Sequence, residues 1–336
     1  MSIPDLTASP AAAPNRCDGV LVIVNHNGGA YLSKCIAAVA NQTCQPHSVI
    51  VIDNASSDGS ADQMLQRFPW VQLIRNERNI GFAAANNLAV QHAPATRWVI
   101  TLNPDAFPEP DWLAQLTKAA TQWSDYTMFA CQLLVADDPS RLDGAGDCYH
   151  TSGLAWRRGH GRSVSERETS EEEVFGPCAA AAMYRRDRFL AVGGFDTDFF
   201  CYMEDVDLAF RLRLLGERCR YVPQARVLHI GSGVTGYRSD FSSYHGQRNM
   251  LWVFFKNMPM GLLLRYLPSF LVVNTVALYI GWRRKQLRII VRAKLDALRG
   301  MRMCWHKRRL IQAQRRVSAA ELVKSFERGW RSLIKR

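Results

Sequence analysis

The sequence predicts an α/β protein built on a doubly wound, mostly parallel sheet. Two observations lead to this prediction. In the first 110 residues, short apolar runs rich in Val and Ile alternate with segments that have helical spacing, and each apolar run ends in a polar loop. The 336 residues are also 48% hydrophobic and 21% charged, which provides for one large or two small globular domains and excludes disordered chains, collagen and small disulfide scaffolds.

Four strand and loop units follow one another along the chain. A buried strand is predicted over 20–24, before the loop NHNGG at 25–29 and a helix over 31–40. A second strand, 48–52, ends in DNASSDGS at 53–60, whose last residues offer several helix N-caps. The third, 71–74, leads to NIGF at 79–82 and a helix over 83–91, and the fourth, 97–102, ends at NPD, 103–105. In a parallel sheet these loops share the carboxyl edge, where ligands bind.

Two carboxylates, Asp53 and Asp105, stand at the ends of predicted strands on this edge. Each could accept hydrogen bonds from a base or a sugar or could bind a hard cation, and each taken alone could equally be a turn residue or a helix cap. A Mg²⁺ or Mn²⁺ ion that bridges a diphosphate needs only one or two protein carboxylates. Asp105 is sufficient for that task, and the neutral Asn103 would contribute hydrogen bonds.

The second half is expected to continue with a strand over 176–184, a helix over 204–215 and a strand over 221–230, with a mobile loop at 157–173. Glu204, Asp205 and Asp207 lie in the first turn of that helix. They could complement the helix dipole, or one could be a general base with its pKa set by the aromatic run at 199–202. Asp207 and Arg211, four residues apart, are expected to pair on the solvent side.

His229 stands at the end of the last predicted strand. It could be structural, or its imidazole could complete a metal site that a carboxylate begins. The sequence contains no Gly-x-Gly-x-x-Gly after the first strand, no P-loop and no Gly-x-Ser-x-Gly elbow. Any bound phosphate would therefore be neutralised by a metal and basic side chains.

The formal charge of +12 is distributed unevenly. Of 42 Lys and Arg and 30 Asp and Glu residues, 18 and 3 lie from Arg283 onward, which leaves 24 and 27 before it. A nearly neutral body therefore carries a tail of about +15, which favours an anionic membrane surface as its partner. The 17 uncharged residues at 266–282 could span a membrane, lie on it, or pack as part of a helical pair on the body.

The nine cysteines include no C-x-x-C pair, so neither a disulfide framework nor a zinc site is indicated. Residues 1–16, rich in Ala, Pro and Ser, are expected to be a disordered leader and not a signal peptide. A reducing cytoplasm is the expected compartment.

The four motifs in this order, VIVNHNGG at 22–29, VIDNASSDGS at 51–60, NIGFAAAN at 79–86 and LNPD at 102–105, resemble the family-2 inverting glycosyltransferases of the GT-A fold. The resemblance covers about residues 18–258. It implies a catalytic domain over 17–258, with a nucleotide-sugar-binding half at 17–110 and an acceptor half at 111–258. Residues 259–336 would then form a hydrophobic helix and a basic amphipathic tail.

The resemblance also implies roles for individual residues. Asp205 would be the general base beside Glu204, and Asp105 and His229 would hold Mg²⁺ or Mn²⁺, although Asn103 replaces the first acid of the family's D-x-D motif. The nucleotide sugar would be bound by residues from both halves: Asn25, Asn27, Asp53, Asn54, Gly81, Asn86, Asn103 and, for the diphosphate, Arg248. The NPD form is similar to that of bacterial rhamnosyltransferase-like members.

The predicted function is therefore inverting transfer of a sugar, such as rhamnose, from a nucleoside-diphosphate sugar to a glycan or lipid-linked acceptor in cell-envelope polysaccharide synthesis. The enzyme would be cytoplasmic and peripheral on the inner face of the cell membrane. Two alternatives remain open. A metal-dependent nucleotidyltransferase shares the sheet and the metal-held nucleotide, but it normally has a basic Gly-rich loop after its first strand. A non-enzymatic protein that binds membranes or nucleic acids would explain the tail and leave the motifs unexplained.

Overall fold

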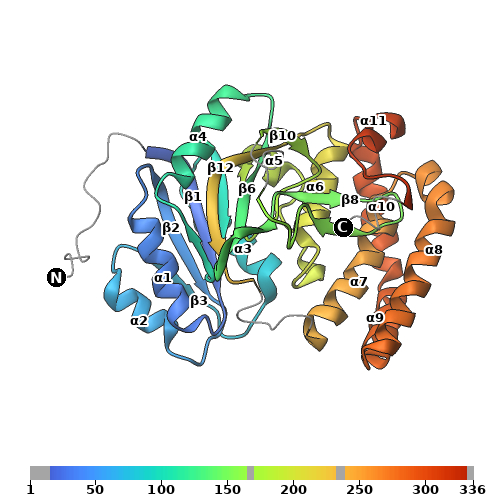
Figure 1. Ribbon diagram of the computed structural model, residues 1–336, viewed down its shortest axis with the longest axis horizontal. Helices are drawn as coiled ribbons and strands as arrows, with labels where there is room; N and C mark the ends of the chain where they lie inside the picture. Colours follow the sequence, from blue (N-terminus) through green and yellow to red (C-terminus); the bar gives the residue numbers. More distant parts are fainter. Residues whose placement is uncertain (1–15, 165–169, 232–238, 331–336) are drawn as a thin grey trace.

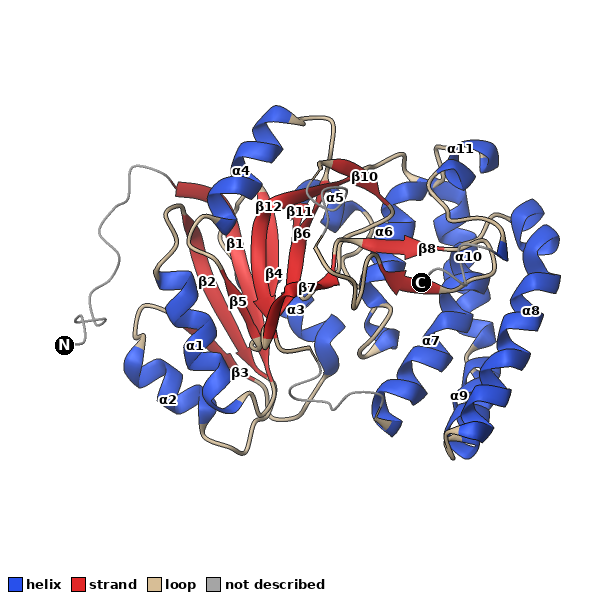
Figure 2. Cartoon of the chain, in the orientation of Figure 1, coloured by secondary structure: helices blue, strands red, loops and turns tan. Residues whose placement is uncertain are grey.

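The computed structural model describes residues 16–164, 170–231 and 239–330 (Figure 1). The predicted leader at 1–16 lies outside this part of the chain except for its last residue. The described residues form a mixed sheet covered by helices on both faces, with further helices gathered at one end of the molecule (Figure 2).

The main sheet has the order β10-β12-β6-β11-β4-β1-β2-β3, with β5 added to β12 and β7 to β6. The bounds of its strands are β1 Arg16–Asn25, β2 Gln45–Asp53, β3 Gln72–Arg75, β4 Trp98–Leu102, β5 Ala106–Pro108, β6 Met128–Val135, β7 Asp138–Gly144, β10 Glu172–Val174, β11 Ala181–Arg185 and β12 Cys219–His229. The four strands that the sequence predicts first, β1 to β4, are mutually parallel, as expected. Beyond β4 the sheet is mixed: β11 runs antiparallel to β4 and β6, whereas β12 is parallel to β6.

The first strand is apolar along its length because both faces of the sheet are covered. Val20, Val22 and Val24 of β1 belong to one core, and Leu21 and Ile23 belong to the other. The helices that cover the sheet are α1 Gly29–Ala40, α2 Ser60–Arg67, α3 Gly81–His92, α4 Trp112–Gln122, α5 Arg186–Ala191 and α6 Glu204–Leu214. These helices divide between the two cores. Buried residues of α1 and α4 belong to the core that contains Leu21, and those of α3 and α6 belong to the core that contains Val20. A separate hairpin pairs β8 Asp147–Tyr149 with β9 Ala155–Arg157.

The remaining helices lie together at the end of the molecule opposite α1 and α2 (Figure 1). Their bounds are α7 Asp240–Asn257, α8 Met260–Arg283, α9 Leu287–Arg299, α10 Met301–Gln314 and α11 Ala319–Lys324. Buried side chains of this group, such as Trp252, Phe270 and Cys304, belong to the same core as α6. Trp252 also donates a hydrogen bond of 3.0 Å from Nε1 to the carbonyl of Ala297 in α9. The residues on both sides of the predicted boundary at 258 are therefore packed into one body.

One expectation about side-chain environment is wrong. The pair Asp207–Arg211 forms, with 2.8 Å between Oδ2 and Nε, but Asp207 is fully buried and Arg211 is 5% exposed. Helical spacing identified the pair, whereas its burial depends on α7, which covers this side of α6 with Lys256 and Asn257. The described residues between the ends of the segment 157–173 are mainly turns and coil, as expected of a loop, while Arg157 ends β9 and Glu172 begins β10; residues 165–169 lie outside the described part of the chain.

Candidate active site

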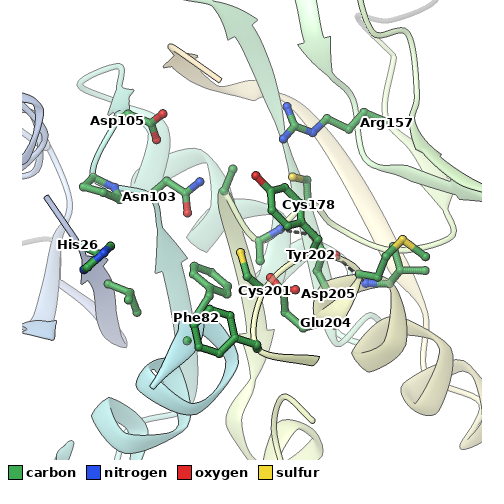
Figure 3. Close-up of a pocket in the computed structure, with 18 of the residues that line it drawn as sticks. His26, Phe82, Asn103, Asp105, Arg157, Cys178, Cys201, Tyr202, Glu204 and Asp205 are labelled. Atoms are coloured by element: carbon green, nitrogen blue, oxygen red, sulfur yellow. Dashed lines mark hydrogen bonds between the residues drawn. The ribbon is translucent and has the colours of Figure 1, made fainter. Parts of the chain in front are cut away.

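A cavity with a volume of about 610 Å³ opens at the carboxyl ends of β1 and β4. One wall comes from the strand-end loops, and the opposite wall comes from the segment that precedes α6 and from β9 (Figure 3). Seven of the residues singled out in the sequence line it together: Asn54, Gly81, Asn103, Asp105, Glu204, Asp205 and His229. Residues that are up to 175 positions apart in the sequence therefore meet at one cavity.

The other five do not line the cavity. Asn25 is buried and donates from its amide to Oδ1 of Asp53 at 3.3 Å and to the hydroxyls of Ser56 and Ser60 at 3.0 Å. Asn27 accepts a hydrogen bond from the N–H of Ser57 at 2.8 Å. These contacts join the loop after β1 to the loop after β2, so these residues fix the shape of the wall from behind.

Asn54 holds the next loop in place. Its amide donates to Oδ1 of Asn79 at 2.7 Å, and its own Oδ1 accepts from the N–H of Ile80 and the amide of Asn76, both at 3.0 Å. Asn86, one turn into α3, is buried and donates to the carbonyl of Phe82 at 2.9 Å. The hydrogen bonds of both residues thus fix loop and helix geometry at the cavity wall.

Asp105 and His229 lie side by side, with 3.4 Å between Oδ1 and Nε2. The two residues are brought together because β5, directly after Asp105, pairs antiparallel with the end of β12. His229 is 2% exposed, and its Nε2 has no well-formed hydrogen bond within the described residues. A buried imidazole nitrogen beside a carboxylate oxygen fits a divalent ion such as Mn²⁺ that takes its remaining ligands from phosphate and water. In the described part of the chain, no group of three or more His, Cys, Asp or Glu side chains is arranged to hold a metal alone.

Asp143, which the sequence analysis did not single out, orients this histidine. Its Oδ2 lies 2.7 Å from Nδ1 of His229, so that Nδ1 carries the proton and Nε2 faces Asp105. Burial by itself would raise the pKa of Asp143. Hydrogen bonds from His160 and His229 and the charge of Arg157 outweigh this effect and hold the pKa well below its usual range. The sequence offered one indication of a functional residue here, because the Gly-rich run at 143–147 begins and ends with Asp.

Glu204 and Asp205 stand on the wall opposite Asp105 (Figure 3). Asp205 accepts hydrogen bonds from the N–H of Ala179 at 3.1 Å and of Val206 at 2.8 Å. Burial raises the pKa of Asp205, and these two N–H groups lower it in part. Burial and then the charge of Asp205 raise the pKa of Glu204 much further, and Oε2 of Glu204 has no partner among the described residues. The pKa of both carboxyl groups is therefore raised, that of Glu204 more than that of Asp205, so that Asp205 is the member of the pair that loses its proton more readily.

The segment before this pair has an unusual backbone. Phe200, Tyr202 and Met203 have φ of +64°, +67° and +69°, values that side chains other than glycine rarely adopt. Gly81 fits closely beneath it, because a Cβ at Gly81 would lie 2.6 Å from the carbonyl oxygen of Phe200. The close approach expected of Gly81 is therefore made to this segment, which we call the 199–203 loop.

Helix α7 holds the 199–203 loop. The amide of Asn249 donates to the carbonyls of Phe199, Cys201 and Tyr202 at 3.0, 2.9 and 2.7 Å. Arg248 donates from Nη2 to the carbonyl of Phe199 at 3.0 Å and from Nε to Oδ1 of Asn249 at 2.9 Å. Arg248, expected at the diphosphate, does not line the cavity, and these contacts give it a structural task at the loop.

Several further lining residues were missed by the sequence analysis. Arg157 projects into the cavity from β9, although its segment was expected to be a mobile loop (Figure 3). Asp147, from β8, is buried, and burial followed by the charge of Asp205 raises its pKa well above the usual range. The aromatic side chains of Trp156 and Phe241 also border the cavity, together with Tyr202 from the aromatic run at 199–202 that the sequence analysis placed beside the acidic pair. Asp147, Trp156 and Arg157 come from short strands that carry no periodic signal, whereas Phe241 lies in the first turn of α7.

Residues 20–192 match the family described as glycosyl transferase family 2, which covers more than half of the chain. The chain belongs to this family. Membership agrees with the resemblance stated from the four motifs and with the mixed sheet of the GT-A fold.

Members of known activity are similar to this glycosyltransferase. The N-acetylglucosaminyl-diphospho-decaprenol L-rhamnosyltransferase of Mycobacterium tuberculosis is 32% identical over 238 residues, which are 64% of this chain and 77% of the relative. Rhamnosyltransferase WbbL of Escherichia coli K12 is 28% identical over 221 residues, or 62% and 82% of the two chains. The mannosyltransferase PcManGT of Pyrobaculum calidifontis, solved with GDP-Man and Mn²⁺, shares the fold with a TM-score of 0.53 at 16% identity over 96% of this chain and 89% of its own.

The predicted function class is thereby confirmed: the chain is a glycosyltransferase that uses a nucleotide sugar. Neither the nucleotidyltransferase nor the non-enzymatic alternative is favoured by these relatives.

Proposed function

We propose that this glycosyltransferase inverts the anomeric centre of its donor, with Asp205 as the general base. The observation that carries the proposal is the position of Asp205 in the cavity wall, across from Asp105, with both oxygens anchored by backbone N–H groups. Fixed hydrogen bonds keep the carboxylate aimed at one point, as proton removal from a positioned hydroxyl requires.

In the proposed step, the acceptor oxygen forms a bond to the anomeric carbon as the bond from that carbon to the diphosphate oxygen breaks. The hydroxyl proton passes to Asp205, and the electron pair of the broken bond leaves with the nucleoside diphosphate. A single in-line displacement inverts the configuration. Asn54, Gly81 and Asn103 would contact the donor, and Asn25, Asn27, Asp53 and Asn86 would support that wall from behind.

Asp105 and His229 would hold a divalent ion, Mg²⁺ or Mn²⁺. When bound, such an ion stabilises the negative charge that develops on the leaving diphosphate. Support comes from the donor set itself, one carboxylate and one oriented imidazole, and PcManGT was solved with Mn²⁺. Glu204, kept protonated, limits the negative charge that faces the donor.

The relatives favour a deoxyhexose such as L-rhamnose as the sugar and a glycan or lipid-linked acceptor in cell-envelope polysaccharide synthesis. One of them is named as a rhamnosyltransferase that acts on a diphospho-decaprenol. The NPD motif at 103–105 favours the same group of donors.

Substitution of the proposed base tests the mechanism. Asp205→Asn keeps the size and the acceptor oxygen of the side chain but cannot take a proton, so we expect transfer to fall by about 10³-fold or more with nucleotide affinity retained. Release of nucleoside diphosphate from donor plus acceptor measures transfer, and calorimetry measures binding. Transfer by this variant at near the unaltered rate would refute the assignment.

We also propose that the enzyme works in the cytoplasm, on the anionic inner face of the cell membrane. Helix α8 is long and apolar enough to cross a membrane, and only 28% of its most apolar stretch is buried. Leu264, Leu271, Tyr279 and Trp282 on α8 and Leu298 on α9 are each more than half exposed. The exposed cations Arg283, Arg284, Lys285, Arg292 and Arg299 accompany them. Exposed apolar side chains bordered by cations are typical of helices that lie in a membrane interface.

Binding to lipid vesicles tests this location. Leu271→Asp should reduce co-sedimentation with phosphatidylglycerol vesicles, because it places an anion where an apolar side chain would enter the interface. Leu190, 52% exposed on α5, provides the matched control, and Leu190→Asp should leave co-sedimentation unchanged. Equal binding by both variants, or no binding by the unaltered chain, would refute the membrane proposal and leave the reaction assignment unaffected.

A further inference from the structure

The proposed donor is an anion, yet the charged side chains that line the cavity are mostly acids. Asp105, Asp147, Glu204 and Asp205 all border it, and among the described lining residues Arg157 is the only Lys or Arg. The leaving nucleoside diphosphate gains negative charge as its bond to the sugar breaks, and the carboxylate of Asp105 would already offset part of the charge of one divalent ion. The basic tail does not supply the missing charge, because none of its described residues lines the cavity.

Most of the hydrogen-bonding capacity of Arg157 is available to a ligand. Within the described residues its guanidinium makes one hydrogen bond, from Nη1 to Oδ2 of Asp143, and its side chain is 33% exposed. Four of the five N–H donors of the fork therefore remain for other acceptors. In Figure 3 the guanidinium extends inward from the wall opposite Asp105, toward the space between them.

The same carboxylate oxygen connects Arg157 to the proposed metal site. Oδ2 of Asp143 accepts from Nη1 of Arg157 and lies 2.7 Å from Nδ1 of His229. Asp143 is 5% exposed, so the two hydrogen bonds are made in a shielded environment where charge-assisted contacts are strong. The cation and the metal-facing imidazole are thus held in a fixed relation by one side chain.

We propose that Arg157 binds a diphosphate beside the metal site, and that Asp143 is a positioning residue for both Arg157 and His229. A planar guanidinium with two free edges suits bidentate contact with phosphate oxygens. The inference rests on the proposed function and deepens it, since it assigns the diphosphate to a residue of β9 instead of Arg248. The diphosphate can come from the nucleotide donor or from a lipid-linked acceptor, because both contain the same group.

The first test measures binding in the absence of reaction. Affinity for dTDP and UDP is measured by calorimetry, in Mn²⁺ and in EDTA, for the unaltered chain and for Arg157→Gln. We expect Arg157→Gln to weaken dTDP or UDP binding about tenfold or more in both buffers, since it removes a charge-assisted contact. Thymidine and uridine, which lack the diphosphate, should bind both proteins equally.

The substitution Arg158→Gln provides the matched control, because it removes the same positive charge from the neighbouring residue. The side chain of Arg158 pairs with Glu172 and lies over the ring of Tyr221, outside this cavity. Arg158→Gln should keep the unaltered affinity for dTDP. Arg157→Lys should recover only part of the affinity, because an ammonium lacks the planar fork.

A second arm distinguishes the source of the diphosphate. If Arg157→Gln weakens binding of farnesyl diphosphate and leaves dTDP and UDP affinity intact, Arg157 serves the acceptor diphosphate. If none of the three affinities changes, the assignment of Arg157 is overturned. Failure of the proposed function has a different signature, namely an unaltered chain that releases no nucleoside diphosphate from any donor and acceptor.

The positioning role of Asp143 has its own readout. Asp143→Asn should weaken dTDP binding and also reduce the gain in dTDP affinity on adding Mn²⁺, because a neutral amide cannot make the charge-assisted contacts that orient Arg157 and His229. Arg157→Gln should keep most of that gain. A general loss of structure would lower the melting temperature and nucleoside affinity together. If Asp143→Asn retains both the affinity for dTDP and the gain on adding Mn²⁺, the positioning role is overturned.

Discussion

The amide of Asn249, in the second half of α7, donates a hydrogen bond of 2.7 Å to the carbonyl of Tyr202, two residues before the acidic pair. The same amide reaches the carbonyls of Phe199 and Cys201. A strained turn with three non-glycine residues at positive φ is thus held by a side chain from a helix that begins only at Asp240. We therefore expect this contact to help position the acidic pair that follows the turn.

Asn249→Asp should lower kcat by about 10- to 100-fold, because a carboxylate of the same shape offers no donor and repels the three carbonyls. Donor affinity should change little, since Asn249 does not line the cavity. Steady-state kinetics with a titration of dTDP separates the two quantities. A variant in which KM and nucleotide affinity change while kcat is retained would contradict this positioning role.

The pH dependence of transfer should reflect the different pKa shifts of Glu204 and Asp205. A general base acts when deprotonated, and burial raises the pKa of Asp205, so activity should fall with decreasing pH at values above those of an ordinary Asp. Glu204, whose pKa is raised further, stays protonated across the same range. Glu204→Gln should therefore keep most of the activity and the same acidic limb. A large loss comparable to that of Asp205→Asn would show that Glu204 takes part as an anion.

Removal of the metal should stop turnover. Excess EDTA is expected to abolish nucleoside diphosphate release, and Mn²⁺ or Mg²⁺ should restore it, because the two proposed ligands leave most of the coordination shell to phosphate and water. Asp105→Asn and His229→Ala should each weaken the Mn²⁺ dependence of dTDP affinity about tenfold or more. Full activity in EDTA would rule out the metal.

Gly81→Ala should disturb the active site from the donor side. The added Cβ would meet both the carbonyl and the ring of Phe200 at under 3 Å, and φ at this position is +84°. Displacing the 199–203 loop should lower kcat about tenfold or more. Gly193→Ala is the control, because φ is also positive there, at +81°, but a Cβ would meet no atom within 4 Å. Equal effects of the two substitutions would attribute the loss to backbone strain alone.

Stability depends on a buried ionic cluster between α6 and α7. Asp207 accepts from Lys256 and Asn257, both at 2.7 Å, and from Arg211 at 2.8 Å, while Lys256 also pairs with Asp196. Asp207→Ala leaves two buried cations short of an anion and should cost about 3–5 kcal/mol in the free energy of unfolding. Lys256→Met should cost less, since Asp207 keeps Arg211 and Asp196 keeps Lys307. Chemical denaturation measures both, and the opposite order would contradict this reading of the cluster.

Local sequence determined the parallel half of the sheet and the donor edge of the cavity. Each of strands β1 to β4 is followed by its own polar loop, so Asn54, Gly81, Asn103 and Asp105 could be placed by reading a few residues on either side. The pair at 204–205 and His229 were found in the same way, as acids opening a helix and a polar residue ending a strand. These are short-range patterns, and burial on both faces of a sheet makes them clear.

Only the tertiary structure decided which of these residues share the cavity and what holds them. Asp143 and Arg157 lie in short turns and strands with no periodic signal, and they meet His229 because β7, β9 and β12 come together in space. Arg248 was expected at the diphosphate from the sequence, whereas in the fold it holds the 199–203 loop together with Asn249. The physical reason is that strand and helix propensities are local, while the partner of a buried polar group is chosen by the packing of distant elements.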